Sequence, residues 1–581
     1  MAIASIPSDE RAAPWMTRDE KRLIFASSLG TMFEWYDFYL YLTLAGVMAP
    51  HFFGHLPAWK GELFVLLAAV CSFLVRPVGA LVFGRLGDLV GRKYTFLLTI
   101  LIMGGATFLV GLLPGHALIG TAAPALLILA RLLQGLAIGG EYGGAAVFVA
   151  EHAPAGRRGL FTSFIQATAT LGLLSSIVVV LTTRWLFGEA AFASYGWRAP
   201  FLLSAGLLGL SLFIRLSLDE SPVFARMKAD GRASRRPLRD AFGNWRNLRR
   251  VLVALFGLTM GQGVVWYAGQ VYALNYMQST LRVDALTAMV LMAWAMALAS
   301  VFFVLFGMAS DHIGRKPILM FGCLAFALGA APVFARIAEI ANPALAHAHQ
   351  AVAVTVVADP ADCGELLSLA DAKRPTTSCD VARELLSSHS VEFRRVAGAP
   401  GVPALVRIAA REPGAQQAPV EIAAFDAAAV EDPARARSAL LDKVYAALEA
   451  AGYPPRDART AVRVAHPFDV LRAQPAEIIG LLFLLVLFVA MVYGPLAAAL
   501  VEMFPARVRY ISLSLPYHIG NGWFGGVTPA IAFAIMAHTG NLLSGLWYPI
   551  AVAATTFVIG VFLLPDATDA DATDAEMDAA A

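Results

Sequence analysis

The decapeptide Gly84-Arg-Leu-Gly-Asp88-Leu-Val-Gly91-Arg92-Lys93 returns later in the chain as Gly307-Met-Ala-Ser-Asp311-His-Ile-Gly314-Arg315-Lys316. Both copies follow the pattern G-x-x-x-D-x-x-G-R-K, and each lies between the second and third of six long apolar runs. Two such decapeptides in register do not arise by chance. They indicate a duplicated six-helix unit, which is the parallel-repeat plan of many membrane transporters.

The composition places most of the chain in lipid. Hydrophobic residues make up 58% of the 581 residues and charged residues 15%, whereas a soluble domain is about a quarter charged. The net charge of +2 gives no support for nucleic-acid binding. The four cysteines exclude a disulfide-dense scaffold, and no C-x-x-C pair points to a metal site. We therefore expect neither a metal nor a cofactor.

Twelve runs of about twenty mostly apolar residues can each cross the bilayer as a helix. They cover 22–45, 62–84, 94–113, 123–150, 160–183, 199–218, 251–277, 286–308, 317–339, 476–500, 511–537 and 543–564. The predicted fold is an all-α membrane protein with twelve transmembrane helices in two six-helix repeats. No apolar signal segment with a cleavage site precedes the first helix, so this helix is expected to remain in the protein.

The repeats divide the chain into seven predicted segments. They are an N-terminal tail (1–21), a six-helix bundle (22–218), a charged linker (219–250), helices seven to nine (251–340), an insertion (341–474), helices ten to twelve (475–565) and an acidic tail (566–581). Arginine and lysine concentrate in the loops on the side of the linker, which predicts that this side and both termini are cytoplasmic. The insertion is then periplasmic, and the protein is expected in the inner membrane.

The repeated decapeptide resembles the signature of the major facilitator superfamily. Other stretches are similar to the metabolite:proton symporter family, which includes permeases for α-ketoglutarate, citrate, shikimate and proline/betaine. These stretches are Phe33-Glu34-Trp35-Tyr36-Asp37-Phe38-Tyr39, Arg76-Pro77-Val-Gly79, Arg131-Leu-Leu-Gln134-Gly135, Gly139-Gly140-Glu141-Tyr142-Gly143-Gly144 and Glu220-Ser221-Pro222-Val-Phe224. The resemblance implies proton-coupled uptake by alternating access. The insertion departs from the family pattern, and no motif selects one substrate.

Ionisable side chains inside the predicted helices are the candidates for proton coupling, because a charge at membrane depth is costly. Glu34 and Asp37 share one face of the first helix, and Glu141 lies in the fourth. We expect Arg131 or Arg76 to pair with Glu34 or Asp37, so that protonation of the carboxylate releases the arginine for an anionic substrate. A permanent ion pair is the alternative, and a structural role is favoured for Arg76.

The candidates for substrate binding follow from the family, in which the first, fourth, seventh and tenth helices line the cavity. They are Arg131, Gln262, Trp266, Gln270 and Tyr493. Hydrogen bonding between helices is the alternative role for these residues. His518 in the eleventh helix could relay a proton, but a packing role is favoured.

The repeated decapeptides are the candidate gate. Their key residues are Gly84, Asp88, Gly91 and Arg92 in the first copy and Asp311, Gly314 and Arg315 in the second. Each aspartate can meet basic residues or a helix N-terminus at the inner face and latch one conformation. Charges that serve only to orient the chain are the alternative.

The insertion mixes predicted strands (Val352–Val357, Leu405–Ala410, Val420–Ala424) with predicted helices (Val381–Leu386, Ala434–Ala451). It is long enough to form a small α+β domain between helices nine and ten, although a flexible loop is the alternative. In an oxidising compartment, Cys363 and Cys379 can form a disulfide that contributes ~3 kcal/mol.

The function that we predict is proton-coupled symport of a small organic carboxylate or zwitterion. The expected partners are this small molecule, protons and the lipid bilayer, and the protein is expected to act as a monomer. A receptor that binds a ligand through the outer domain is the alternative. An enzyme is disfavoured, since the sequence shows no nucleophile–base or metal pattern.

Overall fold

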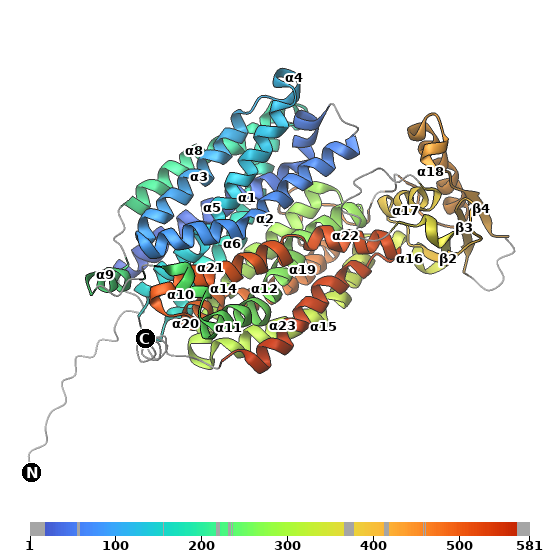
Figure 1. The fold of residues 1–581 in the computed structure, drawn as a ribbon. Helices are drawn as coiled ribbons and strands as arrows, with labels where there is room; N and C mark the ends of the chain where they lie inside the picture. The colour runs from blue at the N-terminus through green and yellow to red at the C-terminus, as the bar shows by residue number, and fades with distance from the viewer. Residues whose placement is uncertain are drawn as a thin grey trace, which may run out of the picture.

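The computed structural model describes residues 18–54, 58–154, 156–216, 221–230, 234, 236–364, 377–411, 418–456, 458 and 460–565. The predicted acidic tail lies outside these residues, as does nearly all of the predicted N-terminal tail. Helices form two packed bundles, and a small domain with a sheet projects from the second bundle (Figure 1). We call the bundles the N-terminal half and the C-terminal half.

The N-terminal half contains six long helices that match the first six predicted spans. They are α1 (Arg18–Phe53), α2 (Ala58–Leu89), α3 (Arg92–Leu112), α5 (Ala122–His152), α6 (Arg158–Phe187) and α8 (Arg198–Leu216). The short elements α4 (His116–Ile119), α7 (Glu189–Ala191) and η1 (Phe192–Gly196) lie in their loops. Within this half α2 packs on α5, α1 on α6 and α3 on α8.

The C-terminal half follows the linker helices α9 (Pro222–Ala229) and α10 (Pro237–Phe242). Its seventh span joins α11 (Trp245–Ala254), η2 (Leu255–Thr259), α12 (Met260–Trp266), η3 (Tyr267–Tyr272), α13 (Ala273–Asn275) and η4 (Tyr276–Thr280). The next two spans are α14 (Ala285–Ile313) and α15 (Arg315–Ala341). The last three contain α19 (Ala473–Tyr493) with α20 (Leu496–Met503), η7 (Ala506–Val508) with α21 (Arg509–His518), η8 (Ile519–Gly525) and α22 (Thr528–Thr539), and η9 (Ser544–Leu546) with α23 (Trp547–Leu563).

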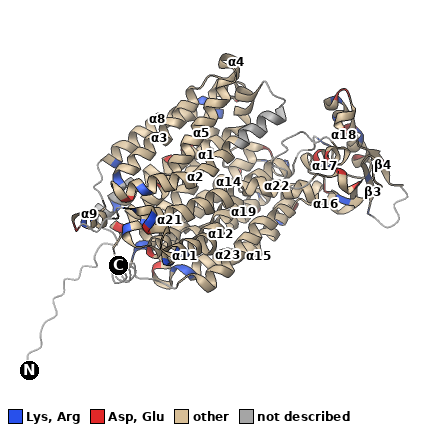
Figure 2. Cartoon of the chain, in the orientation of Figure 1, with Lys and Arg blue, Asp and Glu red and all other residues tan. Residues whose placement is uncertain are grey.

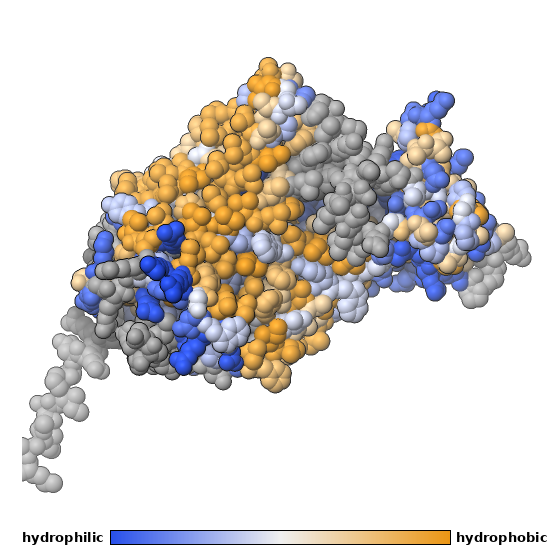
Figure 3. Space-filling model, viewed as in Figure 1, coloured by the Kyte–Doolittle hydropathy of each residue, from blue (hydrophilic) through white to orange (hydrophobic). Residues whose placement is uncertain are grey.

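Eleven helical segments in the described part of the chain are long and apolar enough to cross a membrane. The remaining long helix, α1, has 36 residues, which correspond to about 54 Å, and it packs on α6 as part of the same half. The predicted all-α membrane fold is confirmed. Figure 3 shows a hydrophobic surface over the bundles and a hydrophilic surface over the inserted domain.

Charged side chains gather at one end of the bundles, close to α9 (Figure 2). We call this end the linker side. The inserted domain lies at the opposite end, which we call the insertion side (Figure 1).

The insertion folds as the predicted α+β domain. It contains α16 (Pro343–Ala351), β1 (Val352–Ala358), η5 (Pro360–Asp362), α17 (Ser378–Ser388), β2 (Arg394–Ala397), β3 (Leu405–Ala410), β4 (Val420–Ala423), η6 (Ala427–Ala429) and α18 (Pro433–Ala450). The sheet order is β2-β1-β3-β4, with β1 parallel to β2 and the other pairs antiparallel. Strand β2 was not predicted, because all four of its residues are exposed and it lacks an apolar alternation.

The domain is anchored to the C-terminal half. The Arg282 guanidinium, in the loop after η4, donates to the Tyr445 hydroxyl at 2.7 Å. The backbone N–H of Phe393 donates to the carbonyl of Gly540 at 3.1 Å, just after α22. The N–H of Val464 donates to the Thr287 hydroxyl, in the first turn of α14, at 3.1 Å. These bonds hold the domain against the ends of several spans.

A disulfide joins Cys363 to Cys379 and connects the end of η5 to the first turn of α17. We predict that Cys363→Ser with Cys379→Ser lowers the stability of this domain by ~3 kcal/mol, because the loop is no longer closed in the unfolded chain. Thermal unfolding should show this loss, while transport activity stays normal. Mass spectrometry of protein purified without reductant should find the two residues cross-linked, and two alkylatable thiols would contradict the prediction.

Candidate transport site

The Asp311 carboxylate joins the two halves at the linker side. Its oxygens accept hydrogen bonds from the backbone N–H groups of Gly159 and Leu160, both at 2.8 Å. These two residues lie in the first turn of α6, where the N–H groups have no partner within the helix. Arg315 contacts the same carboxylate at 2.7 Å. Asp311 therefore caps a helix of the other half, as a latch requires.

Asp88 occupies the corresponding position in the first repeat. Its Oδ2 accepts a hydrogen bond from the N–H of Ile511 at 3.2 Å, in the first turn of α21. The two repeated aspartates thus cap opposite halves in a reciprocal arrangement. The side chain of Arg92, which was predicted to belong to this gate, lies outside the described part of the structure.

The motif glycines have two structural roles. Gly91 and Gly314 adopt φ values of 136° and 91° immediately before α3 and α15, a conformation that strains other residues. Gly84 and Gly307 permit close contact between the halves. A Cβ on Gly84 would lie 3.0 Å from the Ile511 Cα, and one on Gly307 would lie 2.2 Å from the Ser163 Cβ.

Two glutamates complete the contacts at the linker side, and the sequence analysis did not select them. Glu151 pairs with Arg509 across the halves at 3.1 Å, and Glu502 pairs with Arg315 at 3.0 Å within the C-terminal half. Both glutamates follow a long apolar run and begin the same short pattern, Glu-x-x-Pro. This second internal repeat was the signal that could have identified them.

The buried carboxylates of α1 have partners other than those expected. Glu34 pairs with Arg215 of α8 at 2.8 Å, and both side chains are buried. The structure therefore does not support the expected pairing of Glu34 with Arg131 or Arg76. Arg215 stands in the last turn of α8, where an arginine suggests only membrane orientation, so the sequence analysis missed it.

Asp37 is buried among neutral groups. Its Oδ1 accepts a hydrogen bond from the Ser204 hydroxyl at 2.5 Å, and Thr107 also interacts with its side chain. Thr107 accepts from Gln134 at 2.7 Å, and the Gln134 side-chain oxygen accepts from Arg131 at 2.5 Å. A chain of polar contacts therefore connects Asp37 to Arg131, without an ion pair to Asp37 among the described residues.

A small aromatic cavity lies where the two halves meet. In this conformation its side chains close around a space too small for a water molecule, and it is lined by Trp35, Tyr39, Arg76, Ala169, Trp266, Tyr267, Tyr493, Tyr517 and Asn521. The Tyr39 ring, from α1, stacks on the Trp266 ring, from α12, with centroids 5.2 Å apart. The hydroxyls of Tyr493 and Tyr517 are hydrogen-bonded at 2.7 Å.

Arg76 is the exceptional residue of this cavity. Its side chain is buried, and none of its guanidinium nitrogens makes a well-formed hydrogen bond in the described part of the structure, although the Tyr267 hydroxyl interacts with it. The guanidinium carbon lies 4.4 Å from the centroid of the Phe38 ring and 4.6 Å from that of Phe73. A buried cation without an anionic partner among the described residues is a candidate site for an anionic ligand. The structural role favoured for Arg76 in the sequence analysis does not account for this.

The other predicted site residues lie at different places. Trp266 and Tyr493 line the cavity. Gln262 accepts a hydrogen bond from Asn521 at 2.7 Å, and Gln270 is buried with no hydrogen-bond partner among the described residues. Glu141 is buried on α5. Arg131 lies nearby but already has partners, since it also donates to Ser72 at 3.3 Å.

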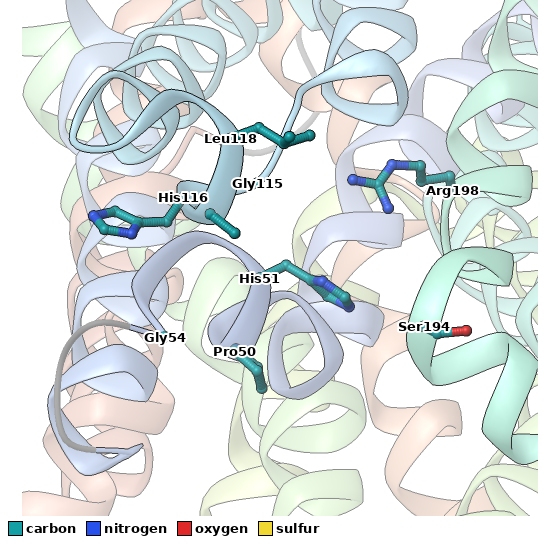
Figure 4. A pocket seen from close by; sticks show the side chains of 9 residues that line it. Pro50, His51, Gly54, Gly115, His116, Leu118, Ser194 and Arg198 are labelled. Atoms are coloured by element: carbon teal, nitrogen blue, oxygen red, sulfur yellow. The ribbon is translucent and has the colours of Figure 1, made fainter.

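A larger pocket lies at the insertion side of the N-terminal half. Its volume is about 580 Å³, and its lining includes His51, His116, Ser194 and Arg198 (Figure 4). All its lining residues belong to one half. Motion of one half against the other would therefore not open or close it, and the central cavity is the better candidate for transport.

Comparisons with known proteins agree with this arrangement. Residues 23–245 match the family described as sugar (and other) transporters. The inner membrane metabolite transport protein YhjE of Escherichia coli (strain K12) is 35% identical, over 52% of this chain and 72% of that protein. The alpha-ketoglutarate permease of the same strain is 34% identical, over 59% of this chain and 78% of the permease.

Other matches extend the comparison. The glycine betaine/proline/ectoine/pipecolic acid transporter OusA of Dickeya dadantii (strain 3937) is 33% identical, over 54% of this chain and 64% of OusA. The solved structure of the major facilitator superfamily proton:xylose symporter XylE bound to 6-bromo-6-deoxy-D-glucose has a TM-score of 0.56 and 14% identity, over 94% of this chain and 96% of XylE. At this identity the likeness shows the fold alone.

The fold and the latch between two repeated halves define a multi-pass membrane transporter rather than an enzyme. The chain belongs to the same transporter family as YhjE and the alpha-ketoglutarate permease, the sugar (and other) transporters, and it has the fold of the major facilitator superfamily. The resemblance noted in the sequence analysis is thereby confirmed.

We predict that Asp311→Asn and Asp88→Asn each slow transport at least several-fold and change substrate affinity less. Each substitution weakens a charge-assisted hydrogen bond between the halves, worth about 1.5–3 kcal/mol, and neither residue lines the cavity. Initial rates and equilibrium binding should be measured on the same preparations.

The matched control is Glu421→Gln, which removes an exposed ion pair with Arg407 in the inserted domain and should leave transport unchanged. Normal turnover combined with much weaker binding in the two aspartate variants would contradict a latch.

Proposed function

We propose that this protein is a proton-coupled symporter that takes up a small zwitterion bearing one carboxylate. Uptake occurs by alternating access across the bacterial inner membrane. The observation that carries the proposal is the buried Arg76 guanidinium in an aromatic cavity between the halves. Arginine binds a carboxylate through two parallel hydrogen bonds, and no carboxylate pairs with the Arg76 guanidinium among the described residues.

The charge of the cavity supports one carboxylate rather than two. Arg76 is the arginine among the lining residues, and Arg131 already has amide and hydroxyl partners. A second carboxylate would therefore enter an aromatic space without a cation, at a high desolvation cost. Among the relatives, this favours a substrate of the kind named for OusA over the dicarboxylate named for the alpha-ketoglutarate permease.

The aromatic lining supports a cationic group at the other end of the substrate. Trp35 stacks on Tyr39 at 5.5 Å, and Tyr39 stacks on Trp266 at 5.2 Å. Aromatic faces attract a methylated ammonium through cation–π interactions, worth about 0.5–2 kcal/mol. Such a group needs no hydrogen-bond acceptor, and no acidic side chain is among the lining residues.

Of the three carboxylates expected to couple transport to protons, Asp37 fits best. A buried carboxyl surrounded by hydroxyls is stable in its neutral form, and its contacts reach Arg131 through Thr107 and Gln134. Glu34 instead has the Arg215 cation as a close partner, which suits a permanent ion pair.

The proposed orientation places the linker side in the cytoplasm and the inserted domain outside. The arginine and lysine residues at the linker side support it (Figure 2). The name of the relative YhjE supports the inner membrane.

The substrate proposal predicts a ranking of uptake into proteoliposomes. Trimethylglycine should be taken up best. The isosteric 3,3-dimethylbutanoate, in which a carbon replaces the nitrogen, should be about 2- to 30-fold weaker, because it has no cation–π interaction. α-Ketoglutarate should be a poor substrate.

Arg76→Gln should abolish uptake of trimethylglycine, and Arg76→Lys should retain part of it. Arg472→Gln, which removes an exposed ion pair with Asp469, is the matched control. Preference for the dicarboxylate, or normal uptake by Arg76→Gln, would refute the assignment.

The coupling proposal predicts that Asp37→Asn abolishes uphill uptake driven by a proton gradient, while exchange of substrate across the membrane survives.

Glu34→Gln should act differently. It leaves the buried Arg215 without its carboxylate, which destabilises the protein by about 3–5 kcal/mol, and the double variant Glu34→Gln with Arg215→Gln should regain stability. Uptake and thermal unfolding should be measured for all three, and full accumulation by Asp37→Asn would sink the coupling role.

A further inference from the structure

His518 is a buried ionisable side chain for which the proposed transport cycle has no role yet. It ends α21, and its relative exposure is 0%. Neither ring nitrogen has a hydrogen-bond partner in the described part of the structure. A packing histidine normally satisfies at least one nitrogen, since a buried unmade hydrogen bond costs about 1–3 kcal/mol. The packing role favoured in the sequence analysis therefore leaves this ring unexplained.

The surroundings of His518 are aromatic. The Tyr517 ring lies 5.0 Å away and the Tyr142 ring, from α5, lies 6.4 Å away, both nearly perpendicular to the imidazole. Tyr517 lines the central cavity and stacks on Tyr142 at 3.4 Å. His518 is therefore directly behind the cavity wall.

Arg76 lies close to the same segment. Gly522 is one helical turn beyond His518, and a Cβ on Gly522 would lie 3.6 Å from the Arg76 Cδ. Arg76 is on α2, which packs on both α21 and η8. A protonated His518 and the Arg76 guanidinium would be like charges on adjoining helices, and like charges in a nonpolar environment repel each other.

The other elements packed against this segment place no second charged side chain against the His518 ring among the described residues. Helix α12 and η2 contain no titratable side chain. On the other packed elements, the charged or titratable groups with described side chains are Cys71, Arg76, Arg85 and Asp88 on α2, Arg131, Glu141, Tyr142, Glu151 and His152 on α5, Arg239 and Asp240 on α10, Arg246, Arg249 and Arg250 on α11, Glu502 on α20, and Arg507 on η7. Among them, the Tyr142 ring is the one that contacts the imidazole.

We propose that His518 is a proton-binding site that is filled when a carboxylate binds Arg76. The carboxylate cancels the Arg76 charge, and the lone pair of the unprotonated ring nitrogen then binds a proton that is taken up from the bulk solution. Because linkage is reciprocal, the bound proton strengthens carboxylate binding by the same factor. One proton thus binds His518 with each substrate molecule. Loss of the proton weakens substrate binding, and loss of the substrate weakens proton binding.

This inference rests on the proposed carboxylate site at Arg76. It assigns to His518 the proton that depends on substrate, whereas Asp37 is not among the residues that line the cavity and bonds to Ser204 instead. If His518 binds this proton, variants of His518 should abolish the proton uptake that accompanies ligand binding. If Asp37 binds it, variants of Asp37 should do so instead.

The test is isothermal titration of trimethylglycine into the detergent-purified full-length protein, in two buffers that differ in ionisation enthalpy. The difference in heat gives the number of protons taken up on binding. We expect uptake approaching one proton for the wild type. We also expect the Kd to fall by up to tenfold per unit decrease of pH, the limit for one linked proton.

His518→Gln, which cannot titrate, should bind the ligand with no proton uptake and a Kd independent of pH. His518→Asn is the second variant, and His466→Gln, at an exposed position of the insertion, is the control that should keep the wild-type behaviour. Ligand binding without proton uptake by the wild type, or uptake that persists in both His518 variants, would overturn the inference alone. Failure of the wild type to bind trimethylglycine would overturn both this inference and the proposed substrate.

Discussion

A charge inside a bilayer needs compensation, and the buried arginines of this protein obtain it in three ways. Arg215 has the carboxylate of Glu34. Arg131 has the side chains of Gln134 and Ser72 and lies over the Tyr41 ring at 4.1 Å. Arg76 has aromatic faces and no carboxylate partner among the described residues. Arg76, the arginine with the least compensation, lies in the cavity between the two halves. We therefore expect the anionic group of a substrate to bind at this arginine.

The aspartates of the repeated decapeptide make compensating contacts between the two halves. Asp311 caps α6 and Asp88 caps α21, so each half holds a helix N-terminus of the other. These contacts are a few charge-assisted hydrogen bonds of about 1.5–3 kcal/mol each. Together these hydrogen bonds can stabilise one conformation. A substrate and a proton that bind a second conformation more tightly can offset this free energy.

The sequence predicted what depends on local pattern. The long apolar runs predicted the spans, the repeated decapeptide predicted that each aspartate meets a helix N-terminus, and the predicted strands of the insertion correspond to β1, β3 and β4. Side-chain partners depend on tertiary neighbours instead. The sequence could not show that Glu34 meets Arg215 rather than Arg131, or that Arg76 has no carboxylate partner among the described residues, because neither outcome changes the hydropathy or spacing of any helix.

The inserted domain fits the same mechanical arrangement. The described hydrogen bonds between this domain and the helices go to the C-terminal half, for example to Arg282, Thr287 and Gly540. If the two halves rock as rigid bodies, the domain moves with the C-terminal half and does not tie the halves together at the insertion side.

Helix α14 links the domain to the latch. It carries Thr287, which holds the domain, in its first turn, and Asp311, which caps α6, in its last turn. Its 29 residues form a helix about 43 Å long. A tilt at one end of a rigid helix also moves its other end. The contact of Thr287 with the domain and the contact of Asp311 with α6 therefore depend on the movement of the same helix. An insertion at this point of the chain can therefore be accommodated without interrupting the motion that transport requires.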